Sequence, residues 1–152
     1  MRSTLFILAL ILAAVFDVLG QTGAERIKGF KDSRFEVVSA NSLFVTSVED
    51  CNNVILVAAY VRRGSLTKTS LSGFAQRIRS RLLKDQTVAI FFFTDLPSAK
   101  RFFETNDPQE DAEVLRAVRG VYTFQGSPLE EKSRTFPSGL TESDLEKVGN
   151  NQ

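Results

Sequence analysis

Residues 54–61 read VILVAAYV and residues 88–93 read VAIFFF, and these two runs decide the fold. Each run is apolar almost throughout and is six to eight residues long, which suits a strand and is too short for an ordinary buried helix. A strand with one face in water alternates apolar and polar residues, whereas a strand covered on both faces does not. Both runs are therefore predicted to be central strands with both faces buried.

The segment between the two runs, residues 62–86, predicts a helical crossover. It is far too long for a hairpin and long enough to connect parallel strands. Ser70 is a suitable N-cap, and Lys84 in the last turn suits the helix dipole. A strand, a helix and a second buried strand predict a right-handed parallel β-α-β unit. The apolar stripe of the helix, at helical spacing, consists of Leu71, Phe74, Ala75, Ile78 and Leu82.

Two segments before this unit are rich in β-branched and aromatic residues. They cover residues 34–39 and 42–48, with Ala40 and Asn41 between them. Such a pattern predicts a β-hairpin with a tight turn at these two residues.

The chain after residue 93 predicts one more helix and two more strands. Residues 94–104 form a short helix capped by Thr94 or Asp95, with a proline in its first turn. A short acidic helical turn then precedes a strand at residues 117–125, and residues 131–136 form a polar edge strand. The fold is predicted to be α+β: one small domain with a mixed sheet of five or six strands, a central β-α-β unit and two helices packed on it.

The start of the chain has the pattern of a secretory signal peptide. One Arg is followed by a continuous apolar stretch over residues 5–16 and then by small residues. Cleavage is predicted before Gln21, with cleavage after Ala24 as the alternative. A retained membrane anchor needs about 20 apolar residues, and Asp17 interrupts this run. We therefore expect a secreted or periplasmic protein with no stable membrane span after cleavage.

The predicted organisation has four parts. The signal peptide is followed by a flexible lead-in with few large apolar residues, then by the folded domain, and finally by a polar tail. These parts cover residues 1–20, 21–33, 34–137 and 138–152.

The composition excludes several chemistries. The chain has no His and one Cys, so Ser-His-Asp and Cys-His catalysis and the usual zinc, copper and haem sites are excluded. No glycine-rich phosphate loop is present, and no cofactor is predicted. Cys51 is either a small residue at a strand start, or a reactive thiol or partner for a disulfide to a second chain. A formal charge of +1 argues against a dedicated nucleic-acid-binding protein.

A basic segment is the first feature that could carry function. No acidic residue occurs over residues 61–84. The segment indicates either a surface for an anionic ligand or protein partner, centred on the helix at residues 70–84, or an ordinary solvated helix face. The candidate residues are Arg62, Arg63, Arg77, Arg79 and Arg81.

The carboxyl edge of the two parallel strands is the second feature. Asp95 follows one strand and Arg62 the other, so the two residues could form a polar cluster that orients a small ligand. The alternative role of Asp95 is to cap the helix that follows it. The sequence thus predicts a non-catalytic binding or interaction module. The alternative is a small carboxylate-dependent enzyme with its site at this edge.

Overall fold

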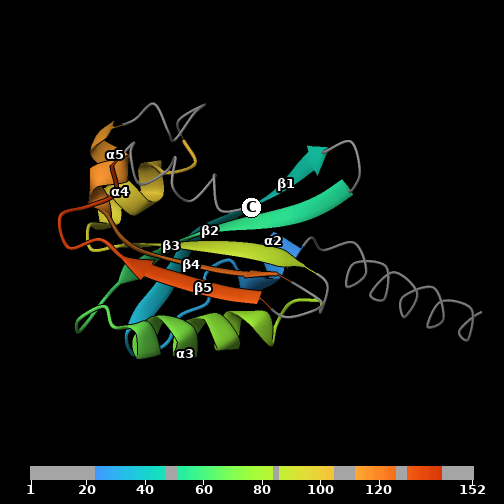
Figure 1. The fold of residues 1–152 in the computed structure, drawn as a ribbon, viewed down its shortest axis with the longest axis horizontal. Helices are drawn as coiled ribbons and strands as arrows, with labels where there is room; N and C mark the ends of the chain where they lie inside the picture. Colours follow the sequence, from blue (N-terminus) through green and yellow to red (C-terminus); the bar gives the residue numbers. More distant parts are fainter. Residues whose placement is uncertain (1–22, 47–50, 84–85, 105–111, 126–129, 142–152) are drawn as a thin grey trace, which may run out of the picture.

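The computed structural model describes residues 23–46, 51–83, 86–104, 112–125 and 130–141, and these form one mixed five-stranded sheet with helices on both faces (Figure 1). The strands lie side by side in sequence order. Only the second and third run parallel, and every other neighbouring pair is antiparallel. The predicted α+β fold with a central β-α-β unit is confirmed. The strands are β1 (Phe35–Thr46), β2 (Cys51–Val61), β3 (Thr87–Phe93), β4 (Val118–Gln125) and β5 (Glu130–Thr135).

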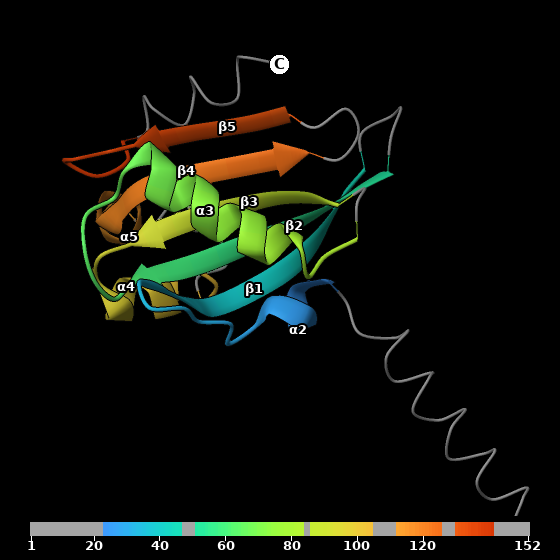
Figure 2. The same ribbon diagram turned by 90° about the horizontal axis from the view of Figure 1, so that it is seen from below.

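The described helices are more numerous than the two that the sequence predicts. They are α2 (Gly23–Ile27), α3 (Lys68–Arg79), α4 (Leu96–Arg101) and α5 (Ala112–Ala117). Figures 1 and 2 show α3 and α2 on one side of the sheet, and α4 and α5 on the other side near one end. The helices α3 and α4 are the two predicted ones. The predicted acidic turn, at residues 107–110, lies outside the described residues, and α5 follows that segment.

The helix α3 begins before the predicted cap. Thr67 has an extended backbone and is the N-cap: its hydroxyl accepts the amide of Ser70 at 3.2 Å, and the Ser70 hydroxyl accepts the amide of Thr67 at 3.0 Å. Ser70 is thus the third helical residue of a capping box and not the cap itself. The predicted stripe is correct in the residues that face the sheet. Leu71, Phe74, Ala75 and Ile78 are buried, and Leu82 is partly buried against them.

The core is divided by the sheet into two layers. Phe74 of α3 lies at the centre of one layer, with ring centroids 4.9 Å from Phe35 and 5.9 Å from Phe92. Phe93 belongs to the other layer, where it meets Phe102 just after α4 at 5.4 Å. Successive residues of a strand point to opposite faces, so β3 serves both layers, as its sequence predicts.

The predicted hairpin at Ala40 and Asn41 is wrong. β1 continues through both residues, which pair with Val57 and Leu56 of β2. Ala40 is buried in the core and paired with β2, so it is part of the strand and not of a turn. A β-bulge at Val38 interrupts the register instead, which adds one residue to β1 without ending the strand.

The lead-in predicted to be flexible is packed against the sheet in its described part. Ala24 and Ile27 of α2 are buried in the same layer as α3. The folded domain also extends past residue 137, because Leu140 is buried and its amide donates to the carbonyl of Leu115 at 3.2 Å. The predicted signal peptide and residues 142–152 of the tail lie outside the described residues. No helix in the described part of the chain has the length and apolar character needed to cross a membrane.

Replacement of Phe74 by Ala should be severely destabilising. The ring is fully buried and contacts three other rings, so its removal leaves a cavity in the α3 layer. We expect a loss of about 3–5 kcal/mol in the free energy of unfolding, measured by urea denaturation. Leu83→Ala is the control: this side chain is 62% exposed, and its loss should cost less than about 0.5 kcal/mol. Equal effects of the two substitutions would contradict this view of the core.

Candidate anion-binding surface

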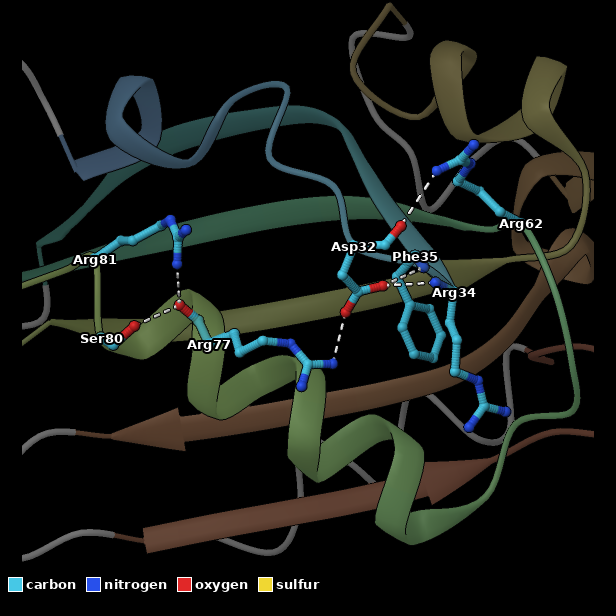
Figure 3. Close-up of polar contacts among 7 residues, drawn as sticks. All are labelled: Asp32, Arg34, Phe35, Arg62, Arg77, Ser80 and Arg81. Carbon is cyan, nitrogen blue, oxygen red and sulfur yellow. Dashed lines mark hydrogen bonds and ion pairs between the residues drawn. The ribbon is translucent and has the colours of Figure 1, made fainter.

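Asp32 organises the polar contacts at the end of the sheet where β1 begins and β2 ends. Its Oδ1 accepts the backbone amides of Arg34 and Phe35, both at 2.7 Å, which fixes the turn into β1. Its Oδ2 accepts from Nη2 of Arg77 on α3 at 2.6 Å, and its carbonyl oxygen accepts from Nη1 of Arg62 at 3.2 Å. Figure 3 shows the side chains of Arg62 and Arg77 reaching Asp32 from the end of β2 and from α3, while Arg34 and Phe35 contact it through their backbone amides.

The loop after β2 is tied to the start of β1 by Arg34. The carbonyl of Arg34 accepts the amides of Arg62 and Arg63 at 2.7 and 3.3 Å, and its Nη2 donates to the carbonyl of Ser65 at 2.9 Å. The guanidinium lies over Gly64, where a Cβ would stand 2.7 Å from Nη2, and Gly64 has a φ of 82°. Only glycine is comfortable at such a position, so this residue permits both the turn and the close approach of Arg34.

We refer to Asp32, Arg34, Glu36, Arg62, Arg63 and Arg77 together as the Asp32 cluster. It contains four guanidinium groups and two carboxylates. Glu36 is only weakly engaged, with its Oε2 3.9 Å from Nε of Arg62 and both side chains about 40% exposed. Arg63 is exposed, and its guanidinium has no hydrogen bond or ion pair within the described residues. The cluster therefore carries an excess of positive charge at the surface.

The pKa of Asp32 is lowered. Burial alone would raise it, but the amides of Phe35 and Arg34 and the guanidinium of Arg77 together outweigh that effect. The carboxylate is thus held in its charged form, as a counter-ion and a structural acceptor.

The helix arginines predicted as one surface have different surroundings. Arg77 joins the Asp32 cluster. Arg79 is half-buried, lies 3.8 Å from Oε1 of Glu131, and has its guanidinium 6.0 Å from the centre of the Phe124 ring. Arg81 stacks at 4.0 Å over the ring of Phe30. Of the predicted arginines, Arg62 and Arg77 both contact Asp32, and Arg63 follows Arg62 in the chain. Arg79 turns to Glu131 instead, and Nη1 of Arg81 donates to the backbone carbonyl of Arg77 at 3.1 Å (Figure 3).

Asp95 is a helix cap in the structure. Its Oδ2 accepts the amide of Ser98 at 2.9 Å and the hydroxyl of Ser98 at 2.5 Å, and these bonds lower the pKa of Asp95. No hydrogen bond or ion pair joins it to Arg62 in the part of the chain that the structure describes, so the predicted polar pair does not form.

A hollow of about 560 Å³ between α3, β4 and β5 was not predicted from the sequence. Its lining includes Lys68, Ser72, Tyr122, Glu131 and Ser133. The hydroxyl of Tyr122 donates to Oε2 of Glu131 at 2.7 Å and lies 3.4 Å from Oγ of Ser72. Burial raises the pKa of Tyr122 above its ordinary value, and the carboxylate of Glu131 adds to this shift. The tyrosine is therefore a neutral hydrogen-bond donor in the wall of the hollow.

Comparison with known protein families, curated proteins and solved structures finds no match for this chain. Among the described residues, no group of three or more His, Cys, Asp or Glu side chains could hold a metal ion.

Replacement of Asp32 by Asn should remove the ion pair with Arg77 but keep an acceptor for the two backbone amides. We expect a loss of about 1 kcal/mol in the free energy of unfolding at pH 7, because the pair is partly exposed. The folded-state pKa of Asp32 is lowered, so its charge stabilises the fold above the unfolded value of about 3.9. That stability is lost as the pH falls through the lower folded-state pKa.

Urea denaturation of the wild-type protein and the Asp32→Asn variant at pH 7, 5 and 3 measures this effect. The difference between them should persist at pH 5 and be smaller at pH 3. Glu36→Gln is the control, since its contact with Arg62 is long and exposed and should contribute less than about 0.5 kcal/mol. A difference between wild type and the Asp32→Asn variant that does not change with pH would show that the charge of Asp32 is not what stabilises the fold.

Proposed function

We propose that this protein is a secreted or periplasmic, non-catalytic binding module that holds an anionic partner on the Asp32 cluster. The observation that carries the proposal is the charge balance of the cluster. The guanidinium groups of Arg62 and Arg77 contact Asp32, Arg34 and Arg63 lie in the same two connected segments, and these four arginines share only two carboxylates. An excess of guanidinium groups gathered at one place is what recognition of sulfate, phosphate or carboxylate groups requires.

The exposure of the arginines supports the proposal. The side chain of Arg77 is 50% exposed although it pairs with Asp32, and that of Arg62 is 41% exposed. Each guanidinium has five N–H donors, and the contacts with Asp32 and Glu36 use only some of them. Donors remain available to oxygens of a bound anion.

The cluster is also partly ordered before any partner binds. Arg34 is fixed by Ser65, Arg62 by the carbonyl of Asp32, and Arg77 by its carboxylate. Ordering a long side chain on binding costs about 0.5–1.5 kcal/mol, so contacts that already restrain it reduce that cost. Because the whole chain has a formal charge of only +1, the attraction is local and should be weakened by salt.

The secreted or periplasmic location is proposed from the signal-peptide pattern of residues 1–20. The alternative of a carboxylate-dependent enzyme has no specific support, since the carboxylate of Asp95 is engaged by the start of α4.

The double substitution Arg62→Gln/Arg63→Gln should weaken binding of the protein to a sulfated polysaccharide column. Two guanidinium groups of the cluster are lost, and we expect an affinity reduced by about tenfold and elution at lower salt. Lys28→Gln/Lys100→Gln is the matched control: it removes the same charge from exposed positions just after α2 and on α4, outside the Asp32 cluster and the β5 edge. Its elution should change little. Equal losses in the two variants would show a response to net charge alone and would contradict the proposed site.

A further inference from the structure

The strand β5 is an edge of the described sheet, and the geometry of its pairing shows which of its backbone groups face outward. The amide of Phe136, just past β5, donates to the carbonyl of Arg119 at 2.9 Å. In an antiparallel ladder, hydrogen-bonded pairs alternate with non-bonded ones. Phe136, Arg134 and Lys132 alternate along the strand and therefore form the hydrogen-bonded pairs with β4. Glu131, Ser133 and Thr135 form the non-bonded pairs, so their N–H and C=O groups point away from β4.

Side chains flank this edge on both faces of the sheet. Ser133 is directly opposite Tyr122, which belongs to the α3 layer, so Ser133 and Glu131 project on the α3 side. Lys132 and Arg134 project on the opposite side. The hollow of about 560 Å³ lies along the β4–β5 pair and is also lined by Lys68 and Ser72 of α3. Figure 2 shows α3 crossing the sheet beside β5.

The charges that border the edge are mainly positive. Lys68, Lys132 and Arg134 are exposed, and none has an ion pair or side-chain hydrogen bond within the described residues. The one carboxylate in the lining, Glu131, is already engaged by Tyr122 and lies 3.8 Å from Arg79. A chain that adds to β5 would therefore meet uncompensated cations on both of its faces.

We propose that the β5 edge binds an acidic peptide segment in extended conformation, as a sixth strand of the sheet. Its backbone pairs with Glu131, Ser133 and Thr135. Alternate side chains enter the hollow towards Lys68, and the others lie beside Lys132 and Arg134. Main-chain bonds of this kind give affinity, while the flanking side chains give specificity. This surface is separate from the Asp32 cluster, which lies beside β1 and β2, and the inference does not depend on the function proposed for that cluster.

The test uses the purified protein and a fluorescently labelled eight-residue peptide of Glu and Val, with binding followed by anisotropy. Ser133→Pro removes an outward N–H and places a ring on the edge, but it leaves the hydrogen bonds to β4 in place. Ser133→Ala keeps the N–H and is the matched control. We expect the proline variant to bind at least about tenfold more weakly than the alanine variant, with unchanged far-UV circular dichroism. Equal affinities of the two folded variants would overturn the proposal.

Two further arms make the result independent of how the proline variant folds. The same acidic peptide methylated at all its central amides keeps its charge but cannot pair with a strand, so it should not bind the wild-type protein. Lys132→Gln/Arg134→Gln should weaken binding of the unmethylated peptide, whereas Arg62→Gln/Arg63→Gln should not. If the methylated peptide binds equally well, or if only the Arg62/Arg63 variant loses binding, the peptide binds through charge elsewhere and the proposal is wrong. The contrast between the two double variants separates this result from failure of the Asp32 cluster as a site.

Discussion

The structure depends on the parallel pairing of β2 and β3. Parallel neighbours cannot be joined by a tight turn, so the chain must leave the sheet after Val61 and return at Thr87, and it does so through α3. Both strands are apolar on both faces, so a helix on one face is not enough. The opposite face near Phe93 is covered by α4 and α5, and together the two layers complete the domain.

The helix α3 connects the core to the polar surface. Its inward side packs on the sheet, while its outward arginines bind strand termini that are far apart: Arg77 reaches Asp32 before β1, and Arg79 reaches Glu131 on β5. Exposed ion pairs of this kind add little stability, about 0–1 kcal/mol each. Their main effect is to hold the arginine side chains in place and to pair the carboxylates nearest to the helix. The uncompensated positive charge is left at the two ends of this arrangement, in the loop after β2 and along β5.

Part of the candidate surface can be predicted from the sequence. Arg62 and Arg63 stand out because they follow a buried strand within a long segment that lacks acidic residues, and both features are local. Asp32 does not stand out, because it lies in a polar stretch with no periodic pattern. Its role arises only when residues 30 and 45 positions away in the chain are brought to it. The sequence offers two roles for Asp95, a ligand group and a helix cap, and its contacts are those of the cap. Its carboxylate accepts the free amide of Ser98, only three residues further along the chain, so the bond forms locally.

The sequence alone determined the two central strands, the crossover helix with its apolar stripe, the cap of α4 and the polar edge strand, since each depends on spacing between near neighbours. Only the tertiary structure decided that β1 runs straight through Ala40 and Asn41, because pairing with β2 overrides a weak turn signal. It also decided that Ile27 is a core residue, and which arginines stand together. Those outcomes depend on contacts between segments that are distant in sequence, and no local pattern records them.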